Sequence, residues 1–161
     1  MLKISKLGDY AVVVLLDLCS AADGERQNTR LIAERTHLPQ TTVSKVLKGL
    51  LRAELVEAHR GLCGGYTLSR PSEEISLLQI IESMDGPLSL TTCSVPSSIN
   101  CKTHSTCSAG PHWPIINQAL TDVLAGISLS QLHRSPSESI VLSGHGSTQE
   151  STEVSRVERR S

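Results

Sequence analysis

The chain has 161 residues, which suits one domain of ordinary size with an appendage, and its formal net charge of −1 neither favours nor excludes a polyanionic partner. No stretch approaches the roughly 18 uninterrupted apolar residues that would span a bilayer. Asp9 and Asp17 bracket the N-terminal apolar run, and no small-residue cleavage site follows it. We therefore expect a cytoplasmic protein with no membrane partner, in which most thiols stay reduced.

Three helices are predicted in the first third of the chain. Residues 5–22 place five apolar side chains at helical spacing: Leu7, Ala11, Val14, Leu15 and Leu18. A short helix over 29–38 follows, with Thr29 able to cap its start. A longer helix over 39–56 tolerates Pro39 near its first turn, and its buried stripe is formed by Val43, Val46, Leu47 and Leu50.

A β-hairpin and a fourth helix come next. The runs "LVEAHR" and "GYTLSRP" flank "GLCG", whose glycines allow positive φ at a tight turn. Ser76 and Gln79 then form an S-x-x-Q capping box, and Ile75 can contact Ile80 as a hydrophobic staple. The dipeptide Gly86-Pro87 predicts the end of this helix.

A last helix is expected over "WPIINQALTDVLAGISLSQL", after a loop that runs from about Leu88 to Pro111. Its apolar face would contain Ile116, Leu120, Val123, Leu124 and Ile127. From about His133 the composition is polar, which predicts a disordered tail because such a segment cannot bury enough surface to offset its ordering entropy.

The two helices joined by a tight turn and followed by a hairpin are typical of a winged helix-turn-helix, so the fold class is mainly α with a small β-wing. In this arrangement the N-terminal part of the second helix enters the major groove. The segment from Arg30 to Arg60 contains six Lys or Arg residues and three acidic residues, a local excess of positive charge that is typical of a nucleic-acid-binding surface. The candidate base contacts are Thr41, Thr42, Ser44 and Lys45.

Three further basic residues complete the predicted DNA-binding surface. Lys48 and Arg52 suit phosphates, and Arg60 at the hairpin tip suits a minor groove or a phosphate. The alternative is an ordinary helical hairpin whose charged residues are only solvated. An enzyme is not expected, because the sequence has no phosphate-binding glycine loop, no G-x-S-x-G and no paired carboxylates in an apolar setting.

Three cysteines, Cys93, Cys101 and Cys107, form a C-x7-C-x5-C run, an odd number that cannot pair off. Structural zinc sites usually space their ligands at about C-x2–4-C in two pairs, so this wider spacing favours an iron–sulfur cluster. Free thiols, a redox pair with a spare, and a zinc site are the alternatives. Three thiolates leave one cluster corner open. The candidates for the fourth ligand are His104, His112 and Asp9.

Residues 1–132 resemble the winged-helix iron–sulfur regulators of the IscR and NsrR family, and within it the regulators of the SUF cluster-assembly operon. The resemblance is carried by "MLKISKLGDYAVVVL", the wing "RGLCGGY", the segment "EISLLQIIESMDGPL", and the three cysteines followed by a tryptophan-led helix. It implies a homodimer in which the Trp113–Leu132 helices pack against each other, on a palindromic double-stranded DNA operator.

The resemblance also implies that Cys93, Cys101 and Cys107 bind a 2Fe–2S or 4Fe–4S cluster. IscR-like members use a histidine three residues after the last cysteine, where this chain has Gly110. NsrR-like members use an aspartate just before the first-helix tyrosine, a position that Asp9 matches. Asp9, supplied by the partner subunit, is therefore the first choice for the fourth ligand, and His112 is the second.

The resulting hypothesis is a transcriptional repressor whose operator affinity depends on the cluster and whose targets are SUF-type assembly genes. A nitric oxide-sensing or thiol-redox-sensing repressor of the same fold is the alternative, and no small-molecule substrate is expected. The corresponding organisation is a DNA-binding domain over 1–87, a cysteine-rich cluster loop over 88–111, a dimerisation helix over 112–133 and a disordered tail over 134–161.

Overall fold

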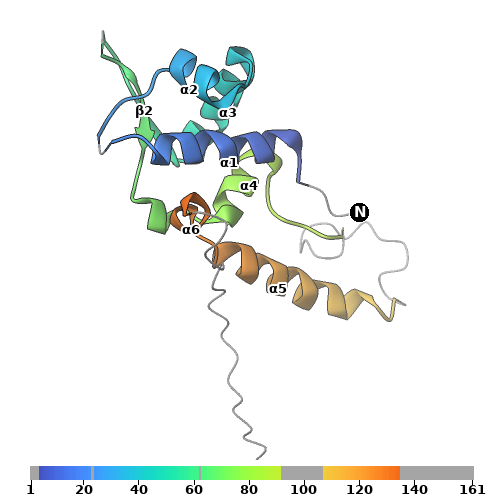
Figure 1. Cartoon of the computed structure of the whole chain (residues 1–161). Helices are drawn as coiled ribbons and strands as arrows, with labels where there is room; N and C mark the ends of the chain where they lie inside the picture. Colours follow the sequence, from blue (N-terminus) through green and yellow to red (C-terminus); the bar gives the residue numbers. More distant parts are fainter. Residues whose placement is uncertain (1–3, 23, 62, 92–106, 135–161) are drawn as a thin grey trace, which may run out of the picture.

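The computed structural model describes residues 4–22, 24–61, 63–91 and 107–134. Helix α1 (Lys6–Cys19) packs against α2 (Thr29–Thr36) and α3 (Gln40–Arg52) on one side and against α4 (Leu77–Asp85) and α6 (Leu129–His133) on the other. Helix α5 (Trp113–Ala125) lies beyond α4, on the side of α1 opposite to α2 and α3 (Figure 1). The fold is thus mainly helical, as the sequence predicted.

The predicted apolar stripes form the core. Ala11, Val14 and Leu15 of α1 and the four stripe residues of α3 have no exposed surface. The core also takes in side chains from the hairpin, α2, α4 and α6, and its buried members outside α1 and α3 are Ile32, Leu55, Val56, Ile75, Ile80 and Leu129. Apolar burial of this kind is the main favourable term in folding, which explains why α2, α3, α4 and α6 assemble around α1.

Helix starts are set by local side-chain caps. The hydroxyl of Ser5 accepts a hydrogen bond from the Gly8 amide (3.0 Å) at the start of α1. Asn28 caps α2 by accepting from the Leu31 amide (2.9 Å), so the expected cap at Thr29 is wrong by one residue. This difference follows from backbone geometry, because Asn28 is extended, as an N-cap residue must be, whereas Thr29 is already helical.

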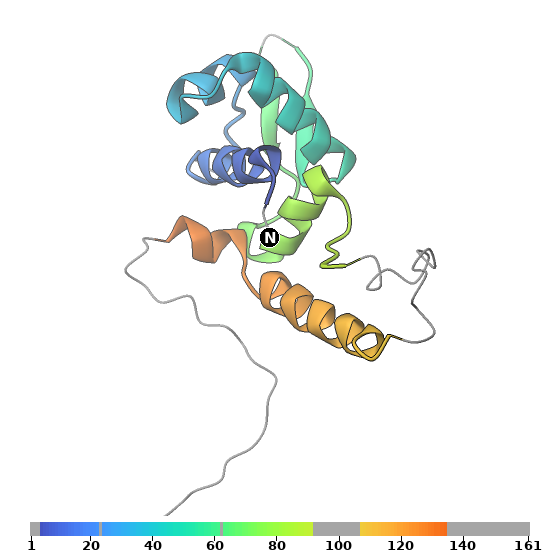
Figure 2. The same ribbon diagram turned by 90° about the vertical axis from the view of Figure 1, so that its right-hand side faces the viewer.

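The hairpin consists of β1 (Val56–His59) and β2 (Gly65–Leu68), which pair antiparallel with Val56 opposite Leu68 and His59 opposite Gly65. Its turn and the α2–α3 pair lie at the same end of the molecule, far from α5 (Figures 1 and 2). A short 3-10 segment, η1 (Ser72–Glu74), then leads into α4. The hairpin is therefore placed as the wing of a winged helix-turn-helix.

Helix α4 begins with the predicted capping box, in which Ser76 and Gln79 bond each other's backbone amides. It ends at Gly86, whose φ of 79° lies in the left-handed region that glycine adopts at little cost. The chain then passes through 87–91 and, after the residues that are not described, enters the 3-10 turn η3 (Gly110–His112) and α5.

The expected single helix over 113–132 is two helices. Helix α5 ends at Ala125, and Ile127 then pairs with the start of α4, accepting from the Leu77 amide (2.8 Å) while Leu129 donates to the Ile75 carbonyl (2.8 Å). Helix α6 begins with a second capping box, formed by Ser128 and Gln131, and buries Leu129 in the core. Ile127 therefore does not continue the apolar face of α5. None of the helices in the described segments combines the length and apolarity that crossing a membrane requires.

Candidate nucleic-acid interface

The outward side of α3 carries four exposed polar or basic residues at i, i+4, i+7 and i+11: Thr41, Lys45, Lys48 and Arg52. This spacing places them on one face of the helix, opposite the buried stripe. Thr42 and Ser44 are half-buried and flank that face. The structure thus brings the six predicted α3 residues to one side of the helix, four fully exposed and two at its edge.

The turn between α2 and α3 fixes how α3 is presented. His37 ends α2 with a φ of 56°, an uncommon left-handed conformation for a residue other than glycine. The Pro39 carbonyl then accepts from the amides of Thr42 (2.8 Å) and Val43 (3.0 Å). The first turn of α3 is therefore closed by its own backbone, and the Thr41 side chain stays exposed to a ligand.

The wing places Arg60 directly after β1, where its side chain is exposed. Gly64 closes the turn by donating its amide to the Gly61 carbonyl (3.0 Å). A Cβ at Gly64 would lie 2.6 Å from the His59 carbonyl oxygen, so a larger residue there would require the backbone to move. Gly65 is similarly confined, because a Cβ would lie 2.9 Å from the Gln27 carbonyl oxygen.

The charge of this surface is concentrated in fewer residues than the sequence count indicated. Arg30 pairs with Glu34 along α2 (2.9 Å), and Arg35 pairs with Asp17 of α1 (2.6 Å). These hydrogen bonds to carboxylates raise the pKa of both arginines above its usual value. Within the described segments, no ion pair neutralises Lys45, Lys48, Arg52 or Arg60.

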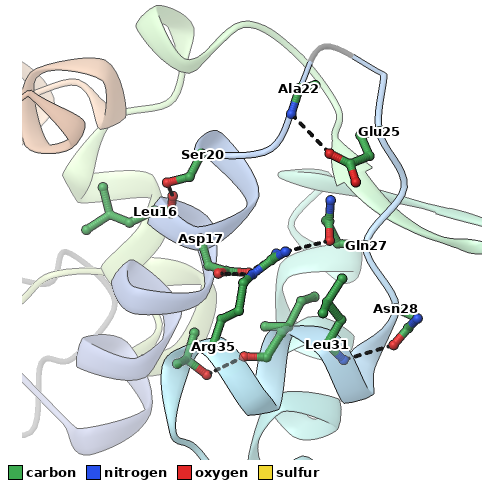
Figure 3. Close-up of polar contacts among 11 residues, drawn as sticks. Leu16, Asp17, Ser20, Ala22, Glu25, Gln27, Asn28, Leu31 and Arg35 are labelled. Atoms are coloured by element: carbon green, nitrogen blue, oxygen red, sulfur yellow. Dashed lines mark hydrogen bonds and ion pairs between the residues drawn. The ribbon is translucent and has the colours of Figure 1, made fainter.

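A polar network behind the interface joins three elements (Figure 3). The Arg35 guanidinium donates from Nε and Nη2 to the two carboxylate oxygens of Asp17 (2.7 and 2.6 Å) and from Nη1 to Oε1 of Gln27 (2.9 Å). Gln27 is fully buried and exchanges both backbone hydrogen bonds with Tyr66 of β2 (3.0 and 2.9 Å). Sequence reasoning missed this network, because its three side chains are far apart along the chain.

The predicted metal ligands are only partly within the described segments. Cys93 and Cys101 lie outside them. Cys107 is a free, half-buried cysteine whose carbonyl accepts from the Gly110 amide (3.3 Å). Asp9 is exposed in the first turn of α1, and His112 is exposed where η3 meets α5. The described residues contain no group of three His, Cys, Asp or Glu side chains that could hold a metal by themselves.

The segment that leads toward Cys93 is fastened to two helices, a feature that the sequence did not indicate. The Leu88 amide donates to Glu82 of α4 (2.9 Å). Asn117 of α5 accepts from the Leu90 amide (3.0 Å) and donates to the Leu88 carbonyl (3.2 Å). This segment, the start of α1 and the start of α5 lie on the same side of the molecule (Figure 2). The Cys107 thiol and the Asp9 carboxylate are suitable ligands for an iron–sulfur cluster, but the two alone do not make a complete site.

Helix α5 has no fully buried residue, and several of its large apolar side chains are open to solvent. Ile115 is 69% exposed, Ile116 47% and Val123 42%. We call these three residues the α5 apolar face. An exposed apolar group of this kind is common at protein interfaces.

The family described as "Rrf2: Iron-dependent Transcriptional regulator" matches residues 4–135. The chain belongs to the Rrf2 family. One Rrf2-type relative, the HTH-type transcriptional regulator NsrR of Oceanobacillus iheyensis, is 30% identical over 146 residues, which cover 89% of this chain and 97% of the relative.

Two solved structures resemble this Rrf2 protein over most of their length. CymR, the global cysteine regulator of B. subtilis, superposes with a TM-score of 0.64 at 26% identity, covering 83% of this chain and 97% of CymR. IscR of T. potens superposes with a TM-score of 0.62 at 26% identity, covering 81% and 85%. The predictions of a winged-helix DNA-binding fold and of a transcriptional regulator rather than an enzyme are confirmed.

Proposed function

We propose that this Rrf2 regulator acts in the cytoplasm as a homodimer and that an iron–sulfur cluster controls how tightly it binds a palindromic operator. The observation that carries the proposal is the position of Cys107, a free thiol at the end of a C-x7-C-x5-C run that joins α4 to α5. Soft thiolate ligands select iron–sulfur clusters, and thiolates in this segment can act on both helices.

The proposed DNA contacts follow from the exposed face of α3. Thr41, Thr42, Ser44 and Lys45 lie on the first turns of α3, the part of a recognition helix that contacts base edges. Lys48 and Arg52 continue the same face and suit phosphates. Arg60 of the wing would then reach an adjacent groove or phosphate, since the wing turn and α3 lie at one end of the molecule (Figure 1).

The proposed dimer contact is the α5 apolar face. A two-fold interface uses the same patch on both subunits, so one exposed helix face is sufficient to form it. Burying Ile115, Ile116 and Val123 against their copies would remove apolar surface that the isolated chain leaves in water. The dimer would present two α3 helices, as a palindromic operator requires.

The proposed cluster ligands are Cys93, Cys101 and Cys107, with Asp9 of the partner subunit as the fourth ligand and His112 as the second choice. Asp9 supports this role because it is exposed at the first turn of α1, on the side of the molecule where the cysteine-containing segment leaves α4 (Figure 2). A bound cluster supplies a rigid crosslink between these ligands. A carboxylate is a weaker ligand than a thiolate here and exchanges more readily, which suits a sensor.

The proposed control acts through a population shift between two spacings of the α3 helices. Leu88 is hydrogen-bonded to α4 and Leu90 to α5. Asp85 at the end of α4 is hydrogen-bonded to Ser5 at the start of α1. Occupancy of the ligands would favour one arrangement of these helices. A shift from mostly weak to mostly tight binding needs a difference of about 5 kcal/mol between the two states.

Genes for SUF-type cluster assembly are the proposed targets, which would make the circuit a feedback loop. The decisive experiment is anaerobic purification of the full chain, with a visible spectrum, iron and sulfide counts and quantitative footprinting on its own promoter before and after cluster removal. The proposal expects iron and sulfide in the protein and a change of about tenfold or more in operator affinity on removal. Cys107→Ser should lose the iron, whereas Cys19→Ser, a half-buried cysteine of α1, should retain it.

Two outcomes would replace this function. Colourless, iron-free protein that forms a disulfide with peroxide and then releases DNA would indicate a thiol-redox repressor. Protein that keeps its cluster in air but loses it selectively on exposure to nitric oxide would indicate a nitric oxide sensor.

A further inference from the structure

We infer that Gln27 is a positioning residue for DNA binding, because its side chain fixes the wing relative to the helix-turn-helix through Arg35. The inference concerns residues that no proposed DNA contact includes, and it rests on the proposed contact of Arg60 for its effect on affinity. It follows from three observations on the polar network of Figure 3.

The first observation is that one guanidinium joins three elements. Arg35 lies in α2, Asp17 in α1 and Gln27 in the strand-like segment that pairs with β2. Every nitrogen of the Arg35 guanidinium has a partner in this network. Planar bidentate pairing with a carboxylate fixes the guanidinium plane, so its third hydrogen bond has a fixed direction.

The second observation is that the Gln27 backbone is hydrogen-bonded to the wing. The Gln27 backbone exchanges both hydrogen bonds with Tyr66, the second residue of β2. Gly65 allows this approach, because a Cβ there would lie within 3.1 Å of three backbone atoms of Gln27. The Gln27 backbone is thus linked to β2, which pairs with β1, the strand that Arg60 follows.

The third observation is that Gln27 is a poor choice for stability alone. Its side-chain amide nitrogen Nε2 is buried and has no hydrogen-bond partner in the described part of the chain. An unpartnered buried donor is costly compared with an apolar side chain of the same shape. The hydrogen bond that the amide does make is the one that its oxygen accepts from Arg35.

The test is Gln27→Leu in the full chain, which removes the accepted hydrogen bond and the unpartnered amide nitrogen but keeps an apolar body in the buried site. We expect the thermal midpoint to change little, because removal of the unpartnered amide nitrogen offsets the loss of the acceptor for Arg35 Nη1. Operator affinity should fall about five- to tenfold. The slope of log affinity against log salt should fall by about 1.8, as when one phosphate contact is lost in each of the two subunits. A change that acted only on folding would move the thermal midpoint and leave this slope unchanged.

A control variant and a double-mutant cycle with Arg60→Ala test the positioning role of Gln27. Thr36→Val breaks a different side-chain hydrogen bond of α2, from the Thr36 hydroxyl to the Ile32 carbonyl (2.7 Å), which joins no other element and changes no charge, and it should leave affinity and slope unchanged. Arg60→Ala should reproduce the loss of slope, and Gln27→Leu should have no further effect in that background.

Wild-type affinity of Gln27→Leu, or full additivity with an Arg60→Ala variant that is itself weakened, would overturn the inference. Wild-type binding by Arg60→Ala alone would instead remove Arg60 from the proposed contacts. In that case a normal thermal midpoint with weakened operator binding by Gln27→Leu would still support the positioning role, and unweakened binding would overturn it.

Discussion

Ser5 and Asp85 join the start of α1 to the end of α4, since the Ser5 amide donates to Oδ2 of Asp85 (3.1 Å) and the Ser5 hydroxyl donates to Oδ1. The two helices approach so closely here that a Cβ on Gly8 would lie 3.2 Å from Oδ2 of Asp85. The contact brings the helix that carries Asp9 against the helix from which the cysteine-containing segment departs.

Ser5→Ala should therefore lower the free energy of unfolding by about 1–2 kcal/mol, because it removes a helix cap and a contact between helices together. Urea unfolding of both proteins at one protein concentration measures the difference. Ser20→Ala, at the other end of α1, removes only a hydroxyl that donates to the Leu16 carbonyl (2.9 Å), and it should change stability by less than about 0.5 kcal/mol. Equal losses in the two variants would contradict this account.

Lys48→Gln should weaken binding to operator and to unrelated duplex DNA by similar factors, because Lys48 is an exposed, unpaired cation on the α3 face. It should reduce the salt slope by about 1.8, since one phosphate contact is lost in each subunit of the dimer. Titrations at several salt concentrations measure both quantities. Lys6→Gln removes the same charge from the exposed start of α1, away from that face, and should leave the slope unchanged. A slope unaffected by Lys48→Gln would exclude a phosphate contact.

Asp9→Ala should reduce the iron bound after anaerobic purification and alter the visible spectrum, if this carboxylate is the fourth ligand. Asp122→Ala, an exposed aspartate of α5, is the matched control and should retain both. If Asp9→Ala keeps its iron and its spectrum while His112→Ala loses them, the ligand is the histidine and the assignment made here is wrong.

Ile115→Glu should raise the dimer dissociation constant by about 100-fold or more, because an unpaired carboxylate would be buried at the proposed two-fold contact. Sedimentation velocity over a range of concentrations measures the shift. Ala125→Glu adds the same charge to an exposed position of α5 away from the α5 apolar face and should leave the dimer intact. Wild-type association of Ile115→Glu would move the interface elsewhere.

Gly64→Ala should destabilise the wing and lower stability by about 1–3 kcal/mol, because the added methyl group meets two backbone oxygens at 2.6 and 2.9 Å. Gly126→Ala is the control, since its Cβ would meet only ordinary contacts at 3.4 and 3.5 Å and its φ of −75° suits alanine. That control should be neutral or slightly stabilising. Equal thermal midpoints for the two variants would contradict the crowding at Gly64.

Local patterns predicted the parts of this fold that local physics determines. The stripe of Val43, Val46, Leu47 and Leu50 and the capping box of Ser76 and Gln79 are both present, because each depends only on spacing within one helix. The four exposed residues of α3 follow from the same periodicity.

The features that sequence reasoning missed depend on partners far along the chain. Arg35 was counted as part of a basic surface, but Asp17 neutralises it from α1. The break between α5 and α6 depends on backbone pairing with residues 75–77, although the S-x-x-Q pattern of Ser128 and Gln131 is a local signal that indicates a new helix start.

The packing of α6 against the core bears on where the chain can be cut without loss of folding. Leu129 belongs to the core around α1, and its amide and the Ile127 carbonyl are hydrogen-bonded to residues 75 and 77, so α6 returns to the winged-helix unit after α5. A polypeptide that ends after α4 would lack Leu129, which fills part of the buried core, and we expect it not to fold on its own. The segment between α4 and α6 is thus anchored to one core at both of its ends, at Leu88 through Glu82 of α4 and at Ile127 and Leu129 through residues 75–77.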